Sequence, residues 1–144
     1  SQYLLAGELF DRAYEKGYDK FVGIAANFRN LIHSINELED DDKIVYFLHH
    51  SELDADGREK VKTIGKMLDE KLTLEGCFDI VLHARTDGQE HWFSTQSDGT
   101  DTAKSPEDMF EAKIPNDLAF VDRTIRDYYG LAPLEIKEKE GKEK

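Results

Sequence analysis

The sequence predicts an α/β domain in which a mixed β-sheet is flanked by helices, and three observations lead to this fold class. Apolar residues recur at helical spacing over the first 38 positions, with charged residues between them. A nearly continuous apolar run follows at residues 43–50, as in a strand that is covered on both faces. Two later strand-like segments are separated by Asp87-Gly88, which favours a hairpin. Helices that alternate with strands in this way indicate helices packed on a sheet.

Two helices are expected before the first strand. Apolar residues recur every fourth position over residues 2–16, and Gly17 ends this pattern. A second helix is expected over residues 19–38, with Asp19 as its N-cap. Its predicted inward positions are Phe21, Ile24, Phe28, Leu31, Ile32 and Ile35.

The middle of the chain is expected to contain a central strand, a loop and a helix. Residues 43–50 are the predicted strand, and the polar residues 51–57 are the predicted loop. Residues 58–73 have the apolar spacing of an amphipathic helix, on which Arg58, Lys62 and Lys66 would form a basic stripe. Cys77 follows, and we expect it to be a buried structural thiol.

The last third of the chain is expected to form a hairpin, a loop and a helix. Residues 78–85 and 91–95 are the predicted antiparallel strands. The polar, turn-rich residues 96–106 should form an exposed and mobile loop, and residues 116–129 a helix. We therefore expect one α/β domain over residues 1–134 and a charged, flexible tail over residues 135–144.

Composition and charge are those of a globular protein that has no evident membrane segment. The 144 residues are 39% hydrophobic and 35% charged, with a net charge of −12. No apolar run approaches the roughly 18 residues that span a bilayer, so we expect a cytoplasmic protein. Only residues 43–76 have a net charge close to zero, at −1, so this is the part of the chain that could readily bind nucleic acid.

Metal, acyl-transfer and phosphate-loop chemistry find little support in the residues. His49 and His50 with Glu52 or Asp54 supply plausible ligand types, but adjacent strand residues point to opposite faces, so no metal site is predicted. The serines have no nucleophile motif around them. Residues 63–67 (TIGKM) have the wrong glycine spacing for a Walker A loop and lie in a predicted helix.

Three segments nevertheless resemble those of phage-encoded RecA-type ATPases, an ATP-binding family linked to phage recombination. They are residues 63–76 (TIGKMLDEKLTLEG), 95–106 (TQSDGTDTAKSP) and 114–118 (IPNDL). In that family the Walker A loop and the Walker B strand precede a segment like Ser1-Gln2-Tyr3-Leu4. The resemblance therefore implies the carboxyl-terminal part of a RecA-like P-loop core. ATP and Mg²⁺ would bind the complete parent protein, whereas this chain alone would lack the groups that stabilise phosphoryl transfer.

The resemblance also implies roles for particular residues. His50 and Ser51, at the end of the first strand, would sense the terminal phosphate or position the attacking water. Lys104 would reach the nucleotide of a neighbouring subunit as a cationic finger, with Arg85 as the weaker alternative. Arg58, Lys62 and Lys66 lie where RecA-like proteins contact DNA, so single-stranded DNA is a possible partner. Homo-oligomerisation, or pairing with a missing amino-terminal half, is expected.

Each assignment has an alternative in which the residue has a structural role or is simply solvated. His50 and Ser51 could be ordinary polar residues at a strand end, Lys104 a solvated loop lysine, and the basic stripe a solvated helix face. The whole chain could likewise be a non-enzymatic binding or interaction module that keeps the α/β scaffold without a nucleotide site.

Overall fold

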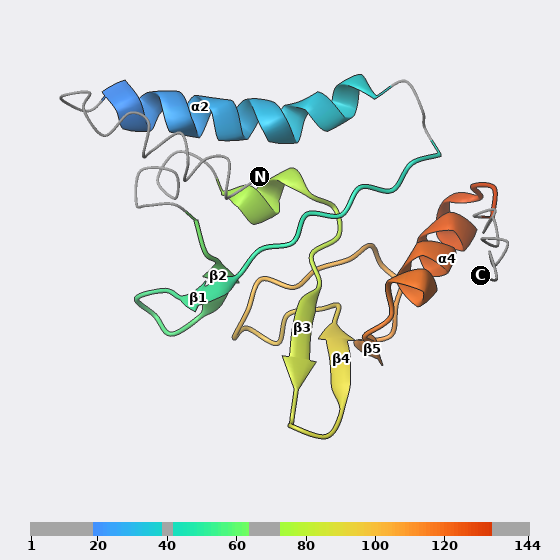
Figure 1. Cartoon of the computed structure of the whole chain (residues 1–144). Helices are drawn as coiled ribbons and strands as arrows, with labels where there is room; N and C mark the ends of the chain where they lie inside the picture. Colours follow the sequence, from blue (N-terminus) through green and yellow to red (C-terminus); the bar gives the residue numbers. More distant parts are fainter. Residues whose placement is uncertain (1–18, 39–41, 64–72, 134–144) are drawn as a thin grey trace, which may run out of the picture.

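A computed structural model of the chain describes residues 19–38, 42–63 and 73–133 (Figure 1). The predicted helix at residues 2–16 and the tail at 135–144 lie outside these ranges. The helices are α2 (Asp19–His33) and α4 (Leu118–Tyr129), with short 3₁₀ helices η1 (Ser34–Glu37) and η2 (Leu74–Cys77). The strands are β1 (Ser51–Leu53), β2 (Glu59–Val61), β3 (His83–Thr86), β4 (His91–Ser94) and β5 (Lys113–Pro115).

The mixed helix and strand content agrees with the predicted class, but the sheet differs from the prediction. The described strands form two sheets, a two-stranded β1-β2 sheet and a three-stranded sheet in the order β3-β4-β5. Every strand pair in these sheets is antiparallel. A single mixed sheet is therefore not present in the described part of the chain.

The hairpin predicted around Asp87-Gly88 is confirmed. In its ladder Ala84 lies opposite Phe93, which in turn lies opposite Ile114 of β5. The Asp87 carboxylate accepts hydrogen bonds from the amides of Gln89 and Glu90, at 2.9 and 2.8 Å, and so closes the turn.

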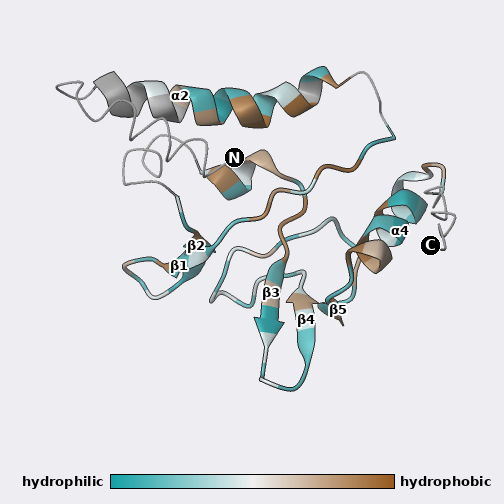
Figure 2. Cartoon of the chain, in the orientation of Figure 1, coloured by the Kyte–Doolittle hydropathy of each residue, from teal (hydrophilic) through white to brown (hydrophobic). Residues whose placement is uncertain are grey.

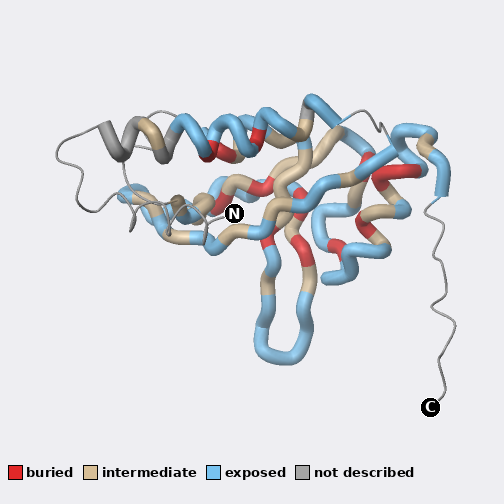
Figure 3. The backbone as a smooth tube through the Cα atoms, turned by 45° about the horizontal axis from the view of Figure 1, so that its top comes forward, coloured by how far each residue is buried: buried red, intermediate tan, exposed pale blue. Residues whose placement is uncertain are grey.

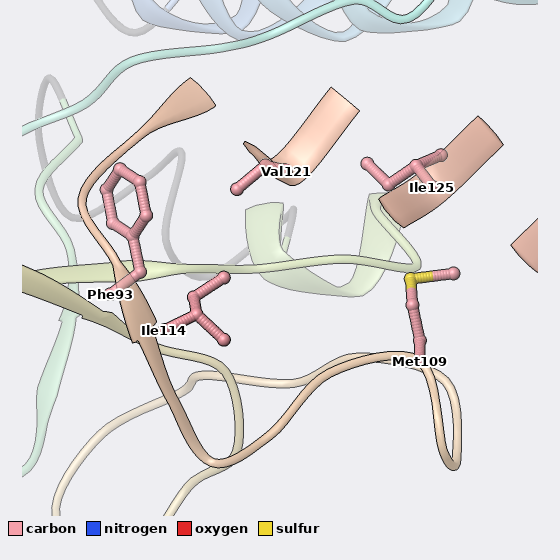
Figure 4. Close-up of a cluster of buried hydrophobic side chains, with 5 residues drawn as sticks. All are labelled: Phe93, Met109, Ile114, Val121 and Ile125. Carbon is pink, nitrogen blue, oxygen red and sulfur yellow. The ribbon is translucent and has the colours of Figure 1, made fainter. Parts of the chain in front are cut away.

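A compact apolar cluster joins the three-stranded sheet to α4, which confirms the predicted carboxyl-terminal helix (Figure 4). Its buried members are Phe93, Met109, Ile114, Val121 and Ile125. Asp117 begins α4 by accepting a hydrogen bond from the Ala119 amide at 2.8 Å, and Gly130 ends it with a left-handed φ of 66°. The alternation of β4 and β5 and the helical period of α4 thus direct one face of each element into this core.

In the view of Figure 1 helix α2 lies above the extended segment 43–50, and Figure 3 shows the buried positions of this helix in red. Phe28 and Ile32 are buried, and the Phe28 ring meets the His49 ring edge-on with centroids 6.0 Å apart. Leu31 is 39% exposed, so its predicted inward position is wrong. Among the predicted inward positions whose side chains are described, Phe28 and Ile32 are thus buried, Ile35 is partly buried and Leu31 is exposed.

The predicted central strand at residues 43–50 is wrong. These residues are extended but belong to no helix or strand, and several of their apolar side chains are exposed. Their apolar character appears as the brown stretch of this segment in Figure 2. Leu48 is 78% exposed and Val45 is 42% exposed. A strand requires a neighbouring backbone to complete its hydrogen-bond ladder, and residues 43–50 belong to neither of the two described sheets.

The predicted loop and helix that follow are also corrected. Residues 51–61 form the β1-β2 hairpin, in which Ser51 pairs with Val61 and Leu53 with Glu59. The Asp54 carboxylate accepts from the amides of Asp56 and Arg58, both at 2.9 Å, and this local turn outweighs the helical spacing. Residues 64–72, the rest of the predicted helix, lie outside the described residues.

Two smaller points complete the fold. Cys77 is exposed rather than buried, because Leu74 takes the inward place in the same 3₁₀ turn. None of the described helices is both long and apolar enough to cross a membrane.

Candidate functional site

Ser51 and His50, the two sensor candidates, lie where the extended segment enters β1. Ser51 donates a short hydrogen bond from its hydroxyl to the carboxylate of Glu59, eight residues later in β2. His50 has an exposed side chain, and its carbonyl accepts from the Lys62 amide at 2.7 Å. The hairpin therefore holds Ser51 through a side-chain contact and His50 through its backbone.

A partly buried polar cluster includes Ser51, which is exposed at its edge, and we call it the Arg85 cluster. Its members are Ser51, Glu59, Glu75, His83, Arg85, Asp101 and Thr102. Arg85 of β3 is at the centre and donates to the Glu59 carboxylate through Nη1. Its Nη2 donates to Oδ2 of Asp101 at 2.5 Å. One guanidinium thus joins two carboxylates from distant parts of the chain.

The other members of the cluster make further polar contacts. The His83 ring lies between Glu59, whose carboxylate is 3.7 Å from Nδ1, and Thr102, whose hydroxyl is 3.2 Å from Nε2. The Glu75 carboxylate accepts from the Val61 amide at 2.8 Å. Buried polar groups are expensive unless they are hydrogen-bonded, and these contacts meet that requirement.

The cluster favours the ionised form of both carboxyl groups. The Ser51 hydrogen bond, together with Arg85, lowers the pKa of Glu59 in spite of its partial burial. Burial alone would raise the pKa of Asp101, but the Ala103 amide and the Arg85 guanidinium outweigh it and the pKa is lowered. Burial would lower the pKa of Arg85, yet its bonds to Asp101 and Glu59 raise it.

Residues 96–106 are not the exposed, mobile loop that the sequence predicts. Asp101 and Ala103 are only 3% exposed. Asp101 accepts from the Ala103 amide through Oδ1 at 2.9 Å, and Lys104 exchanges two backbone hydrogen bonds with Val81. Polar composition misleads here because the polar side chains bond back to the loop's own backbone.

Lys104, the finger candidate, is held at this backbone bridge while its ammonium group remains uncommitted. Its side chain is half-buried and makes no ion pair with any residue in the described ranges. Lys113 provides a contrast, since its ammonium lies 3.2 Å from Glu90 and 4.2 Å from the centre of the Trp92 ring. Lys104 is therefore available to an external anion, whereas Lys113 is paired.

The three basic residues predicted to contact DNA do not form a helical stripe in the described chain. Arg58 precedes β2 and donates from Nε to the Asp101 carbonyl at 3.0 Å. Lys62 follows β2 and is exposed. Lys66 lies outside the described residues. The turn and the short strand replace the helical period that would align these side chains.

The arrangement excludes some chemistry. Ser51 donates to the Glu59 carboxylate rather than to an imidazole, and the lowered pKa of Glu59 makes this carboxylate a weak base, so the pair gives no support to acyl transfer. Within the described ranges, no group of three His, Cys, Asp or Glu residues is arranged to hold a metal ion.

A hollow of about 650 Å³ beside the 96–106 segment is also unsuited to nucleotide. Its wall includes the acidic residues Glu107, Asp108 and Glu111 together with Phe110 and Phe120. Carboxylates at this density repel phosphate groups.

Sequence reasoning missed Glu59 and Asp101, the two carboxylates that pair with Arg85, together with Glu75, His83 and Thr102. Glu59 gave no signal because it lies within residues 58–73, for which the sequence predicts a helix. Asp101 lies in a polar segment whose turn-forming residues predict local turns. They do not indicate that Asp101 pairs with a residue of β3.

Comparisons with protein-family models, with curated proteins and with solved structures found no match to this chain.

Proposed function

We propose that the chain is the carboxyl-terminal portion of a phage RecA-like ATP-binding protein that acts in DNA recombination in the cytoplasm, and that it does not hydrolyse ATP by itself. The proposal starts from the likeness of residues 63–76, 95–106 and 114–118 to that family. The complete protein would bind ATP and Mg²⁺ through Walker segments upstream of this chain.

The observation that supports this proposal best is the exposed edge at residues 43–50. The segment is extended and rich in apolar residues, yet Val45 is 42% exposed, Tyr46 37% and Leu48 78%. Runs of this composition normally occur in strands that are covered on both faces. Further strands of a RecA-like sheet, supplied by an upstream half or by a second subunit, would pair with this edge and bury it.

Within the proposed protein, Ser51 and His50 act as phosphate sensors and Lys104 acts in trans. The hydrogen bond to Glu59 fixes the Ser51 side chain at the end of the extended segment, which suits a group that senses a terminal phosphate at a set distance. The Lys104 ammonium forms no ion pair within the described ranges, and it is suited to a nucleotide bound by a neighbouring subunit. The active form would therefore be an oligomer.

The first test compares two proteins: this chain alone and the product of the complete reading frame that contains it. Binding and hydrolysis of Mg-ATP are measured for both, by calorimetry and by phosphate release. We expect the longer product to bind and hydrolyse ATP and the chain alone to do neither. Hydrolysis by the chain alone, or a reading frame without Gly-x-x-x-x-Gly-Lys-Ser/Thr upstream, would refute the proposal.

The trans role of Lys104 has its own test in the longer product. Lys104→Ala should lower kcat at least ~100-fold, because a finger that stabilises transition-state charge is worth about 10³ to 10⁵ in rate. Lys113→Ala is the matched control, since Lys113 is paired with Glu90, and it should change kcat less than about twofold. Mixing Lys104→Ala with a variant of the Walker A lysine should restore part of the activity, whereas a lysine acting in cis gives no restoration.

Single-stranded DNA is the proposed partner, with Arg58 and Lys62 as contacts from this chain and Lys66 as a third, untested by the described residues. Two or three cations neutralise few phosphates, so their contribution should be weak and strongly salt-dependent. Arg58→Ala with Lys62→Ala should reduce the slope of log K against log salt by about 1.4, at roughly 0.7 per phosphate contact. An unchanged slope would remove these residues from the DNA surface.

The second candidate function is a non-enzymatic interaction module. The ion pairs within the Arg85 cluster favour the interaction module, because the Arg85 guanidinium already pairs with Glu59 and Asp101. A native mass that matches this chain alone, together with no ATP binding, would favour the module over the ATPase portion.

A further inference from the structure

Three segments that are far apart in the sequence meet at the Arg85 guanidinium. Arg85 itself belongs to β3, Glu59 to the β1-β2 hairpin, and Asp101 to the 96–106 segment. The backbone adds one more tie between the last two, since the Glu59 amide donates to the Thr100 carbonyl at 2.8 Å.

One arm of this junction leads to Ser51. Glu59 accepts hydrogen bonds from both the Ser51 hydroxyl and Arg85, one at each of its carboxylate oxygens. The position of the Ser51 hydroxyl therefore depends on how Arg85 holds Glu59.

The other arm leads to Lys104. Asp101 uses Oδ2 for Arg85 and Oδ1 for the Ala103 amide, at 2.5 and 2.9 Å. Its carbonyl also accepts from the Ser97 hydroxyl at 2.7 Å. These bonds fix the backbone immediately before Lys104, which then pairs with Val81.

The chemistry of the junction requires arginine. A guanidinium presents a planar fork of donors that can bond two carboxylates at once, whereas a lysine ammonium is a point charge on a flexible stem. Arg85 is therefore unsuited to act as a cationic finger, because its charge is already matched by Glu59 and Asp101.

We propose that Arg85 is a positioning residue that sets the placement of the Ser51 sensor relative to the Lys104 finger, by bonding Glu59 and Asp101 at the same time. The inference rests on the proposed function for the roles of Ser51 and Lys104. The mechanical link that it describes can be measured in this chain without nucleotide.

The first experiment is amide hydrogen exchange, read residue by residue, on this chain and on its Arg85→Lys and Arg85→Gln variants. Arg85→Lys keeps the charge, and should therefore keep the fold if Arg85→Gln loses it. In each folded variant, exchange should accelerate at least ~10-fold at the amides of Glu59, Ala103 and Lys104. The amides of α4 serve as the internal reference, and they should stay unchanged because local opening does not reach the core.

Lys113→Gln is the matched control, since it removes a cation that is paired with Glu90 on the same sheet but joins no distant segments. It should leave exchange at Ala103 and Lys104 unchanged. If Arg85→Lys also leaves these amides as protected as in the parent chain, the positioning role is overturned, whether or not the longer product hydrolyses ATP.

The second experiment measures kcat and KM for the same variants in the longer, ATP-hydrolysing product. Arg85→Lys should lower kcat at least ~10-fold with less than a threefold change in KM, because the groups are misplaced while the nucleotide site remains. Faster exchange with an unchanged kcat overturns the catalytic part of the inference. A longer product that hydrolyses no ATP defeats the proposed function, and the exchange result then decides whether Arg85 couples the two segments.

Discussion

The substitution Asp101→Asn isolates the charge of one buried carboxylate in the Arg85 cluster. Asp101 is 3% exposed, with Oδ1 bonded to the Ala103 amide and Oδ2 to Arg85. Asparagine has nearly the same size and can still accept from Ala103 through its carbonyl oxygen. Its amide group would then face the Arg85 guanidinium, so that two donors meet where an ion pair stood.

The expected cost follows from the burial of the two partners. Breaking a buried ion pair by removing one charge costs about 3–5 kcal/mol. The Arg85 side chain is 29% exposed and keeps Glu59 as a second partner, so water and Glu59 offset part of this cost. We therefore expect Asp101→Asn to lower the free energy of unfolding by about 2–3 kcal/mol at pH 7.

Urea denaturation followed by the fluorescence of Trp92, the only tryptophan, measures this difference. The matched control is Asp98→Asn, three residues earlier in the same segment. Asp98 is exposed and bonds only to Thr100 among the described residues, a contact that asparagine can keep. The control should change stability by less than about 0.5 kcal/mol. Equal, small effects of both substitutions would refute the ion pair as a stabilising contact.

The same pair of proteins also has a defined pH dependence. Because the pKa of Asp101 is lowered on folding, its ionisation adds stability that is complete above the unfolded pKa of about 3.9 and is lost as the pH falls through the folded value. Asparagine lacks this contribution at every pH. The difference in unfolding free energy between parent and Asp101→Asn should therefore be constant from pH 7 to about pH 5 and shrink below about pH 4. A difference that grows on acidification would contradict the assigned charge state.

Three further predictions concern the core and the ends of α4, all measured by urea denaturation. Val121 is fully buried, so Val121→Ala should cost about 2–3 kcal/mol through lost burial and the cavity that it leaves; a cost below 1 kcal/mol would show that the core closes around it. Asp117→Ala removes the cap on the Ala119 amide and should cost about 1 kcal/mol, whereas no cost would mean that solvent replaces the cap. Gly130→Ala should cost about 1–2 kcal/mol because its φ of 66° strains an L-residue, while Gly76→Ala, outside the left-handed region, should not destabilise; similar values at both positions would contradict this reading.

Local sequence signals predicted the elements that are stabilised locally. Asp87 and Gly88 select the turn of the β3-β4 hairpin, and Asp117 and Gly130 mark the two ends of α4. These residues act through bonds to their own neighbours, so their effect can be read without knowledge of the rest of the chain. Strand β4 and helix α4 were accordingly placed within about two residues of their observed ends, whereas the first predicted strand of the hairpin, residues 78–85, begins well before β3 (His83–Thr86).

The errors fall where the outcome depends on distant partners. Residues 43–50 have the composition of a buried strand, but a ladder needs a second backbone that composition does not reveal. The helical spacing after Arg58 was real, yet the Asp54 turn and the pairing of Ser51 with Val61 override it across residues 51–61. A short apolar period is compatible with more than one element when a strong turn lies beside it.

The candidate site divides in the same way. His50 and Ser51 were reached from their place at the end of a predicted strand, and Lys104 was reached from the family resemblance, on which the proposed roles of all three depend. Glu59 and Asp101 were not reached, since their importance comes from meeting Arg85, which lies 26 and 16 positions away in the sequence. The sequence by itself determined the mixed helix and strand content, the hairpin turn and the carboxyl-terminal helix, because those depend on contacts over a few residues. Only the tertiary structure decided that a single guanidinium joins two distant carboxylates, because burial makes their charges costly unless they are paired with one another.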